Sequence, residues 1–369
     1  MIKNENLTAR LMDTPEDYQR LGVNPERIEK WEDGIRIKGA EGEWEWWYFD
    51  CILDDGSAAI IQFFSKGYRD LTGDVLKPFG TIKLTESDGT SHVRLFEIPA
   101  QECRFSNETC DVHIGKHIFS GDLTDYRILV DPIDGLGADL HLHSLAQPYR
   151  PGTAYLGFGE KDEKIFTWLC AVSKGEVCGT LTVNGQTRQV KGSSYHDHQW
   201  GNNLYLSLFN HWTWARQRYD DYTVVLFDMM AAEPYGYQRF PFFFIQDAQG
   251  KLVFSNTHGV NYEVLENYDD EATGKDYPKS GRYRFHHDGK DFEYTLTWNQ
   301  ELETGYVVRN LPLADLAELS KTHPKHNDTY KLYLTTGTLQ IRDGGQTIER
   351  SDSLIYEFMY SGADYRSHV

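Results

Sequence analysis

One short segment gathers most of the side chains in this chain that could do chemistry. Residues 195–201 are Tyr-His-Asp-His-Gln-Trp-Gly, so two imidazoles, a carboxylate, an indole and a phenol stand at neighbouring positions. Turn-forming residues flank the segment on both sides, which predicts a short strand. Alternate side chains of a strand share a face. We therefore expect one face to carry His196, His198 and Trp200, and the other to carry Tyr195, Asp197 and Gln199.

A second group of candidate residues follows on the next two predicted strands. Trp212, Trp214 and Arg216 recur at every second position, so they share one face of a strand. Asp228 comes directly after the apolar run 224–227, which is typical of a strand buried in a core. Titratable groups and large aromatic faces therefore come from consecutive strands, and the rest of the chain has to position them.

These residue types suit acid–base chemistry in an apolar pocket with aromatic walls. Desolvation in a hydrophobic strand would raise the pKa of Asp228 and keep the carboxyl protonated as a proton donor. Asp197 is the alternative donor, with His196 or His198 assisting. Tryptophan and tyrosine faces would stabilise a developing carbocation by cation–π attraction. Taken singly, each residue is better explained as an ordinary core side chain, but the set as a whole favours a function.

Two other kinds of site receive less support. His196 and His198, two positions apart on a strand, can ligate one metal ion, but no third ligand stands at a fixed spacing. A nucleophilic serine within Gly-X-Ser-X-Gly is absent, and the Gly-X-Gly pairs at 135–137 and 157–159 lack a following helix. We therefore expect no metal and no nucleotide chemistry.

Strand patterns at even spacing account for most of the chain. The run 44–53 is followed by a tight turn and a returning strand at 58–64, and similar runs recur as far as residue 360. Asn184-Gly185 is a strong signal for a two-residue hairpin. Leu311–Ser320 is the one clear helical stretch in the second half. The pattern predicts an all-β fold of sandwiches or barrels with few short helices.

The length of 369 residues exceeds one ordinary core, so we expect two domains. Residues 1–40 are predicted to form an N-terminal arm with a short helix capped at Thr14. Residues 41–201 are predicted as one β domain and residues 202–369 as a second. No linker rich in Pro, Gly or Ser separates them, so the two domains are expected to pack together.

The composition narrows the partners and the location. A net charge of −19 argues against binding to nucleic acid or to an anionic membrane surface. No apolar run approaches the ~18 residues of a membrane helix, and the N-terminus lacks the apolar core of a secretory signal. The five cysteines lack metal-type spacing and are expected to be reduced, mostly buried thiols. A cytoplasmic protein is expected, and the sequence does not indicate its oligomeric state.

Two segments carry a family resemblance together. Residues 45–50, Glu-Trp-Trp-Tyr-Phe-Asp, and residues 195–201 resemble the paired motifs of the carotenoid 1,2-hydratase (hydroxyneurosporene synthase) and AttH-like family. That family includes kievitone hydratase-like and fungal Diels–Alderase-like proteins. The resemblance extends from about residue 40 over most of the chain. It implies two lipocalin-like β-barrel domains, no cofactor and an apolar substrate of terpenoid or polyketide type. Gln199 departs from the family pattern, in which asparagine is more usual.

The residues and the resemblance together predict a cofactor-independent hydratase or cyclase that protonates a carbon–carbon double bond of an isoprenoid-like substrate. By position, the resemblance implies roles for His196 or His198, Trp200 and Asp228. Two alternatives stay open: a non-catalytic lipocalin-like carrier of lipophilic ligands, and a pericyclase that shapes its substrate without acid catalysis. The predicted catalytic residues are Asp228, His196, His198 and Asp197, and the predicted substrate-binding residues are Trp200, Trp212, Trp214, Tyr195, Arg216 and Trp47.

Overall fold

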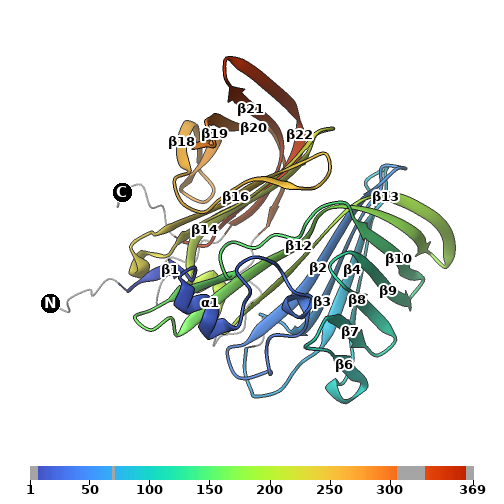
Figure 1. The fold of residues 1–369 in the computed structure, drawn as a ribbon. Coiled ribbons are helices and arrows are strands. Elements are labelled where there is room, and N and C mark those ends of the chain that lie inside the picture. The colour runs from blue at the N-terminus through green and yellow to red at the C-terminus, as the bar shows by residue number, and fades with distance from the viewer. Residues whose placement is uncertain (1–6, 69–70, 306–328, 363–369) are drawn as a thin grey trace. The chain divides into compact units, whose positions relative to one another are not determined.

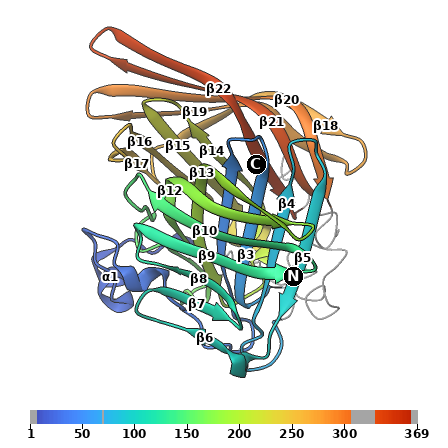
Figure 2. The same ribbon diagram turned by 90° about the vertical axis from the view of Figure 1, so that its right-hand side faces the viewer.

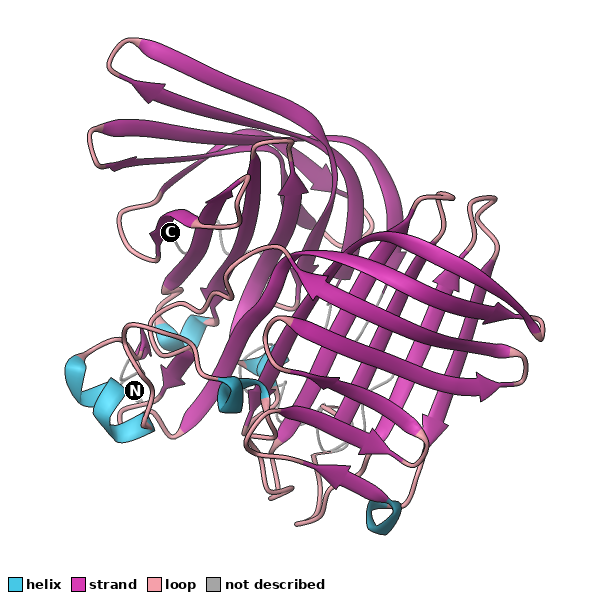
Figure 3. Cartoon of the chain, turned by 45° about the vertical axis from the view of Figure 1, so that its right-hand side comes forward, coloured by secondary structure: helices cyan, strands magenta, loops and turns pink. Residues whose placement is uncertain are grey.

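The computed structural model describes residues 7–68, 71–305 and 329–362. The fold is nearly all-β, with 64% strand and 6% helix, and Figure 3 shows how completely strands dominate. This confirms the all-β prediction with few short helices. The helix predicted at Leu311–Ser320 lies outside the described residues. Within the described ranges, none of the helices has the length and apolar character needed to cross a membrane.

The N-terminal residues form short elements rather than long strands. Thr14 caps the first helix, because its hydroxyl accepts a hydrogen bond from the Asp17 backbone and Asp17 bonds back to the Thr14 backbone. Gly22 ends the helix in the left-handed conformation, with φ 68°. The cap predicted at Thr14 is confirmed. The short elements of the N-terminal residues are β1 (Ala9–Leu11), α1 (Pro15–Leu21) and the 3-10 helix η1 (Lys30–Asp33).

The next strands build a 13-stranded antiparallel sheet that curls into a half-barrel (Figures 1 and 2). Its order is β5-β4-β3-β2-β13-β12-β10-β9-β8-β7-β6, and β11 joins β12 to β1. The hairpin predicted at Asn184-Gly185 is present, with φ of 51° and 78° as a tight turn of this kind requires. The strands are β2 (Trp44–Leu53), β3 (Ala58–Lys66), β4 (Phe79–Thr85), β5 (Ser91–Glu97), β6 (Cys103–Phe105), β7 (Cys110–Ile114), β8 (His117–Gly121), β9 (Asp125–Ile133), β10 (Leu136–Ser144), β11 (Tyr155–Phe158), β12 (Lys164–Val183) and β13 (Gln186–Gly201), with the 3-10 helix η2 (Ala100–Glu102) between β5 and β6.

The two ends of this sheet close over one hydrophobic core. Phe63 of β3 packs edge-on against Phe119 of β8 with ring centroids 5.7 Å apart. Phe96 of β5 stacks on His117 of β8 at 3.8 Å. Strands that lie far apart in the sheet order thus contribute to the same apolar cluster. We call the face turned to this core the inner face and the opposite one the outer face.

A second sheet of nine antiparallel strands curls in the same manner, in the order β17-β16-β15-β14-β22-β21-β20-β19-β18. Its own aromatic core includes Phe243 of β16, which packs against Tyr283 and Phe285 of β19. The strands are β14 (Phe209–Arg218), β15 (Tyr222–Ala231), β16 (Arg239–Asp247), β17 (Leu252–Asn256), β18 (Asn261–Asp270), β19 (Lys275–His287), β20 (Lys290–Gly305), β21 (Thr329–Asp343) and β22 (Gln346–Tyr360), with the 3-10 helices η3 (Tyr205–Ser207) and η4 (Glu233–Tyr235).

The chain divides into two compact units. Residues 10–157 and 161–204 form the unit we call N-terminal, and residues 205–369 with 1–9 and 158–160 form the unit we call C-terminal. Each unit contains one of the two curled sheets, which confirms the prediction of two lipocalin-like β-barrel folds in the form of half-barrels. Residues 10–40, expected as part of an arm, belong to the N-terminal unit and carry α1 and η1.

Candidate functional site

The motif residues of β13 point alternately to opposite faces of the sheet, because side chains of a strand alternate with a period of two residues. On the inner face, His196, His198 and Trp200 lie in the core and are at most 3% exposed. On the outer face, Tyr195 and Gln199 both donate hydrogen bonds to the side chain of Asp197. The assignment of faces from the sequence is therefore confirmed.

Cross-strand pairing continues the outer face of β13 over four further strands. Asp197 lies opposite Tyr48 of β2, and Tyr48 lies opposite Gln62 of β3. Gln62 pairs in turn with Thr81 of β4, and Thr81 pairs with Leu95 of β5. Directly paired residues share a face, so the five form one row. A neighbouring row on the same face comprises Gln199, Trp46, Phe64, Phe79 and Glu97.

A cavity of about 630 Å³ lies at the β3–β5 end of these two rows. Small-molecule sites typically enclose roughly 300–1,000 Å³, so the cavity has the size of a ligand site. In the described part of the chain its charged lining residues are Lys77 and Glu97, and Glu97 is exposed. The other lining residues are mainly apolar or aromatic: Gln62, Phe64, Gly67, Tyr68, Leu76, Pro78, Phe79, Thr81, Leu95, Ile98, Pro99 and Ala100.

Stacked aromatic rings shape one wall of this cavity. The rings of Phe64 and Phe79 are 4.2 Å apart and nearly parallel, at 6°. Trp46 packs against Phe64 at 6.0 Å and against Tyr68 at 5.7 Å. Gly67 leaves room for the stack, because a Cβ atom there would stand 2.6 Å from the Phe79 ring. The wall thus offers flat apolar surface to an unsaturated ligand.

Asp197 is the buried acid of the outer face. The Tyr195 hydroxyl donates to its Oδ2 at 2.8 Å and the Trp168 indole N–H donates to the same oxygen at 3.2 Å. Burial raises the pKa of Asp197 above its usual range, and the hydrogen-bond donors offset only part of that effect. Asp197 does not line the cavity: two strand spacings of about 4.8 Å separate it from Gln62, roughly 10 Å in all.

On the inner face, His196 faces a carboxylate. Its Nε2 lies 3.1 Å from Oδ2 of Asp33, and its Nδ1 lies 2.8 Å from the backbone carbonyl of Tyr48. The Tyr126 hydroxyl donates to the same Asp33 oxygen at 2.6 Å. Burial alone would lower the pKa of His196, but the facing Asp33 carboxylate raises it above its usual value. Burial would likewise raise the pKa of Asp33, yet the histidines and Tyr126 bring it below its usual range. The two groups form a buried ion pair.

His198 stands between two carboxylates. Its Nε2 lies 3.1 Å from Oε1 of Glu45, and its Nδ1 lies 3.4 Å from Oδ1 of Asp33. Glu45 in turn accepts hydrogen bonds from the Arg36 backbone at 2.6 Å and from the Ser65 hydroxyl at 2.6 Å. The network ties the segment that contains η1 to strands β2, β3 and β13.

Two of the predicted substrate-binding tryptophans also lie in this core. Trp47 stacks on the His198 ring at 4.6 Å and donates its indole N–H to the Asp33 carbonyl at 2.9 Å. Trp200 packs against His198 at 4.6 Å and donates to the Tyr155 hydroxyl at 3.3 Å. Both indoles pack against the His198 ring on the inner face, and neither lines the outer-face cavity. Their role in substrate binding stays a prediction.

The surroundings of Asp228 differ from those predicted. The residue lies on β15 in the C-terminal unit and is buried, as expected, at 3% exposure. Its carboxylate is ion-paired with Arg239, whose Nε donates to Oδ1 at 2.8 Å, and it accepts a hydrogen bond from the Tyr283 hydroxyl at 2.8 Å. The sequence did not indicate this partner on β16, and the role of Asp228 as a proton donor stays a prediction.

The cavity beside Asp228 is too small for the predicted substrate. Its volume is about 100 Å³, and Asp228, Arg239 and His211 belong to its lining. At roughly 30 Å³ per molecule, it has space for a few waters. Burial together with the nearby Arg239 charge lowers the pKa of His211 to about 3. The cavity is thus a small polar pocket within the C-terminal unit.

Trp212, Trp214 and Arg216 share one half-buried face of β14, as predicted. Asp228 lies opposite Thr213, which alternates with these residues, so Asp228 lies on the other face of the sheet. The Trp212 indole donates to Glu357 at 3.1 Å. Trp212, Trp214 and Arg216 therefore lie on one face of the sheet, and Asp228 lies on the opposite face. Their roles in binding stay predictions.

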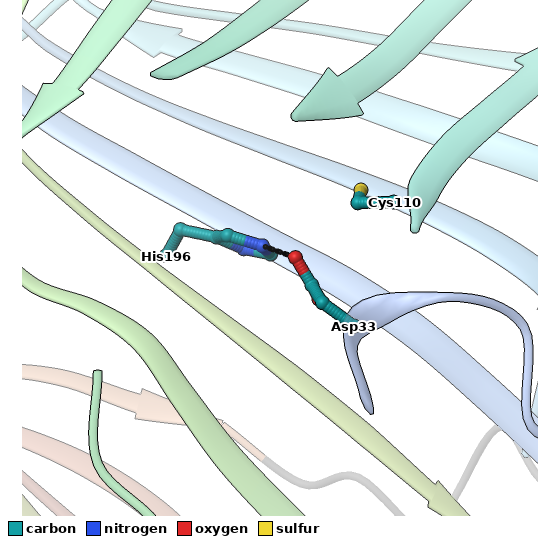
Figure 4. Close-up of side chains that lie close together, drawn as sticks. All are labelled: Asp33, Cys110 and His196. Carbon is teal, nitrogen blue, oxygen red and sulfur yellow. Dashed lines mark hydrogen bonds and ion pairs between the residues drawn. The ribbon is translucent and has the colours of Figure 1, made fainter. Parts of the chain in front are cut away.

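Sequence reasoning missed the partners that complete the inner-face cluster. Asp33, Cys110 and His196 bring one oxygen, one sulfur and one nitrogen atom within 4.8 Å of one another (Figure 4). Among the described residues, these three are the group that could hold a metal ion. No spacing rule connects positions 33, 110 and 196. Glu45 did carry a signal, since it opens the aromatic motif at 45–50.

Comparison with known proteins gives four likenesses. Residues 79–308 match the family model described as AttH-like. The Diels-Alderase ucsH of an Acremonium species is 22% identical over 325 residues, which cover 81% of this chain and 75% of that protein. A Nitrosomonas europaea protein solved as an AttH has a TM-score of 0.56 at 15% identity, covering 92% of this chain and 98% of its own. CghA, solved with Sch210972, has a TM-score of 0.59 at 13% identity over 97% and 99%. At these identities the likeness to the solved structures shows the fold alone.

Proposed function

This chain belongs to the AttH-like family, and we propose that it is a cofactor-independent cyclase that closes a ring in an apolar, unsaturated small molecule. One observation carries the proposal. The cavity on the outer face of β3–β5 has the volume of a ligand site and a stacked aromatic wall, and its one acidic lining residue in the described part of the chain, Glu97, is exposed. Such a site can select a folded conformation of its ligand, but it offers no buried proton donor at the wall.

The shape of the cavity alone can be sufficient to catalyse a pericyclic ring closure. Binding can hold a flexible polyene so that its reacting carbons lie about 3–3.5 Å apart. The polyene then loses its conformational entropy on binding, so this loss no longer adds to the barrier of the chemical step. The parallel rings of Phe64 and Phe79 present a flat surface for a conjugated chain. The likeness to a Diels-Alderase across 81% of the chain supports this reaction class.

Acid protonation of a double bond, as in a hydratase or an acid-dependent cyclase, is the second candidate. Asp197 favours it, because burial raises the pKa of this carboxyl and it lies on the same sheet face as the cavity. A substrate would have to extend about 10 Å from Gln62 across Tyr48 to reach it. Asp228 fits this role less well, since its carboxyl group is engaged by Arg239 and the cavity beside it has a volume of only about 100 Å³.

Two exposed residues of β5 test the cavity without disturbing the fold. Leu95 lines the cavity and is 53% exposed, whereas Val93, on the same face of the same strand, is 55% exposed and does not line it. Leu95→Trp fills the cavity and should weaken binding of a fluorescent conjugated tetraene fatty acid by about tenfold or more, which equals about 1.4 kcal/mol. Val93→Trp, the matched control, should bind it as the unmodified protein does. Equal affinity in both variants would place ligand binding elsewhere.

Turnover separates the cyclase from a carrier. Linear polyenes that carry a conjugated diene and a distant alkene are incubated with the protein, and the products are analysed by mass spectrometry and NMR. Ring closure that Leu95→Trp suppresses and Val93→Trp preserves is the expected result. Saturable binding of every polyene with recovery of unchanged ligand would instead identify a lipophilic carrier.

A further inference from the structure

Three side chains from distant segments converge inside the N-terminal unit. Asp33 ends η1, Cys110 begins β7 and His196 lies in β13, as Figure 4 shows. All three are buried, at no more than 1% exposure, and their oxygen, sulfur and nitrogen atoms lie within 4.8 Å of one another. Carboxylate, thiolate and imidazole are all groups that ligate zinc, so the three side chains form a candidate metal site.

The orientation of His196 is that of a metal-binding histidine. Its Nδ1 lies 2.8 Å from the Tyr48 carbonyl oxygen and must donate to it, since a carbonyl can only accept. Nε2 is thereby turned toward Asp33, 3.1 Å away. Histidines that bind metals usually fix their ring through a hydrogen bond of this kind from the other nitrogen.

A second observation concerns the two carboxylate oxygens of Asp33. Its Oδ2 accepts from Tyr126 and His196, but its Oδ1 is buried without a hydrogen bond from any described residue. Nδ1 of His198 faces this oxygen as an ion-pair partner at 3.4 Å, and it too makes no hydrogen bond within the described ranges. An unpaired carboxylate oxygen in a core calls for a water molecule or an ion as its partner.

We propose that Asp33, Cys110 and His196 bind a zinc ion that fastens η1 and β7 to β13. Cysteine, histidine and aspartate are all established zinc ligands, and the fourth position is left for a water molecule. The ion replaces two protons, one from the Cys110 thiol and one from the His196 imidazolium. Thiolate and carboxylate then offset its two positive charges, so the net charge of the core does not change.

This site is structural and separate from the proposed reaction. His196 lies on the inner face of the sheet, whereas the cavity lies over the outer face of β3–β5. Because the cluster is closed, the ion has to enter while the chain folds. Loss of zinc should therefore change stability, and loss of the cavity should change ligand binding, so the two proposals fail independently.

Refolding of the full chain tests the site directly. The protein is unfolded in denaturant with a chelator and refolded with Zn²⁺, with Co²⁺ or without metal. About one ion per chain should be retained after gel filtration, and zinc should raise the unfolding midpoint. The Co²⁺ form should show a sulfur-to-cobalt charge-transfer absorption, which reports a thiolate ligand.

Two buried cysteines of one core provide the matched variants. Cys110→Ser should abolish the charge-transfer absorption and reduce retained zinc to about a tenth or less. Cys51→Ser, in the same apolar cluster, should leave both unchanged. If Cys110→Ser fails to fold, the unmodified protein still decides the question. No retained metal and an unchanged midpoint would overturn the proposal and leave a hydrated ion pair, and equal loss in both variants would also overturn it.

Discussion

His196 in the N-terminal unit and His211 in the C-terminal unit are both buried strand histidines, and their neighbours carry opposite charge. His196 faces Asp33, whose carboxylate raises the imidazole pKa despite burial. His211 is near Arg239, and burial with this positive charge lowers its pKa to about 3. In the metal-free chain, the carboxylate favours the charged form of His196, whereas burial and the cation favour the neutral form of His211.

The two buried ion pairs also differ in what they connect. Asp33 and His196 join η1 to the middle of a sheet, across 163 positions of sequence. Asp228 and Arg239 lie on the adjacent strands β15 and β16, which backbone hydrogen bonds already join. The first pair therefore links two segments that no backbone ladder joins, and the second lies within a ladder that exists without it. Variants in the two clusters should behave differently for that reason.

The largest effect is expected from Asp33→Ala. Removing one partner of a buried ion pair leaves the other charge uncompensated, which costs about 3–5 kcal/mol of the free energy of unfolding. Urea unfolding measures this cost. The control is Asp125→Ala, which breaks an exposed aspartate–histidine pair with His143 in the same unit and should change stability little. Equal losses in the two variants would mean that the Asp33 pair does not hold η1.

A second prediction concerns acid and the C-terminal unit. The folded-state pKa of His211 is about 3, below the ~6.5 of an unfolded histidine, so the unfolded state takes up the proton first. Stability is thus lost as the pH falls from about 6.5 toward 3, by about 3 kcal/mol at pH 4. Hydrogen exchange of β14 at pH 7 and pH 4 measures the loss. His211→Gln should remove most of this pH dependence, and an unchanged slope would assign it to another group.

The smallest effect on turnover is expected from Asp197→Asn. A pericyclic reaction needs no proton donor, so ring closure should stay within about threefold of the unmodified rate and show a flat pH–rate profile. If Asp197 protonates the substrate, the same change should cost about two orders of magnitude, or about 2.7 kcal/mol of barrier. Asp228→Asn extends the comparison to the ion-paired acid. It should lower stability, while turnover per folded molecule stays near normal.

The sequence predicts local structure well here because the alternation of residue types along a strand indicates which face of the sheet each residue occupies. The strands at 44–53 and 58–64, the hairpin at Asn184-Gly185 and the two faces of β13 all follow from patterns within a few residues. The residues that pack against a buried face come from distant parts of the chain, so the sequence near that face does not identify them. Asp33 and Cys110 approach His196 only because the sheet curls, and no pattern near position 196 identifies them.

The same limit explains why neither the Arg239 partner of Asp228 nor the cavity could be predicted from the sequence. An apolar run around an aspartate indicates burial correctly, but it does not reveal that Arg239 follows on the next strand with its guanidinium on the carboxylate. Phe64 and Leu95 lie within predicted strands, yet the cavity needs residues 76–78 and 98–100 to wall it. Both features depend on segments that come together only in the folded unit.

The pairing of β14 with β22 has a consequence for how the chain is made. Trp212 lies opposite Met359, so the fourth strand in the order of the C-terminal sheet finds its neighbour only when β22 is available. Until residue 360 has left the ribosome, the edge of β14 that pairs with β22 stays open. Long-range pairings of this type form slowly, and open edges invite pairing with other chains. During synthesis, the C-terminal unit is therefore the part of the protein that most depends on protection from aggregation.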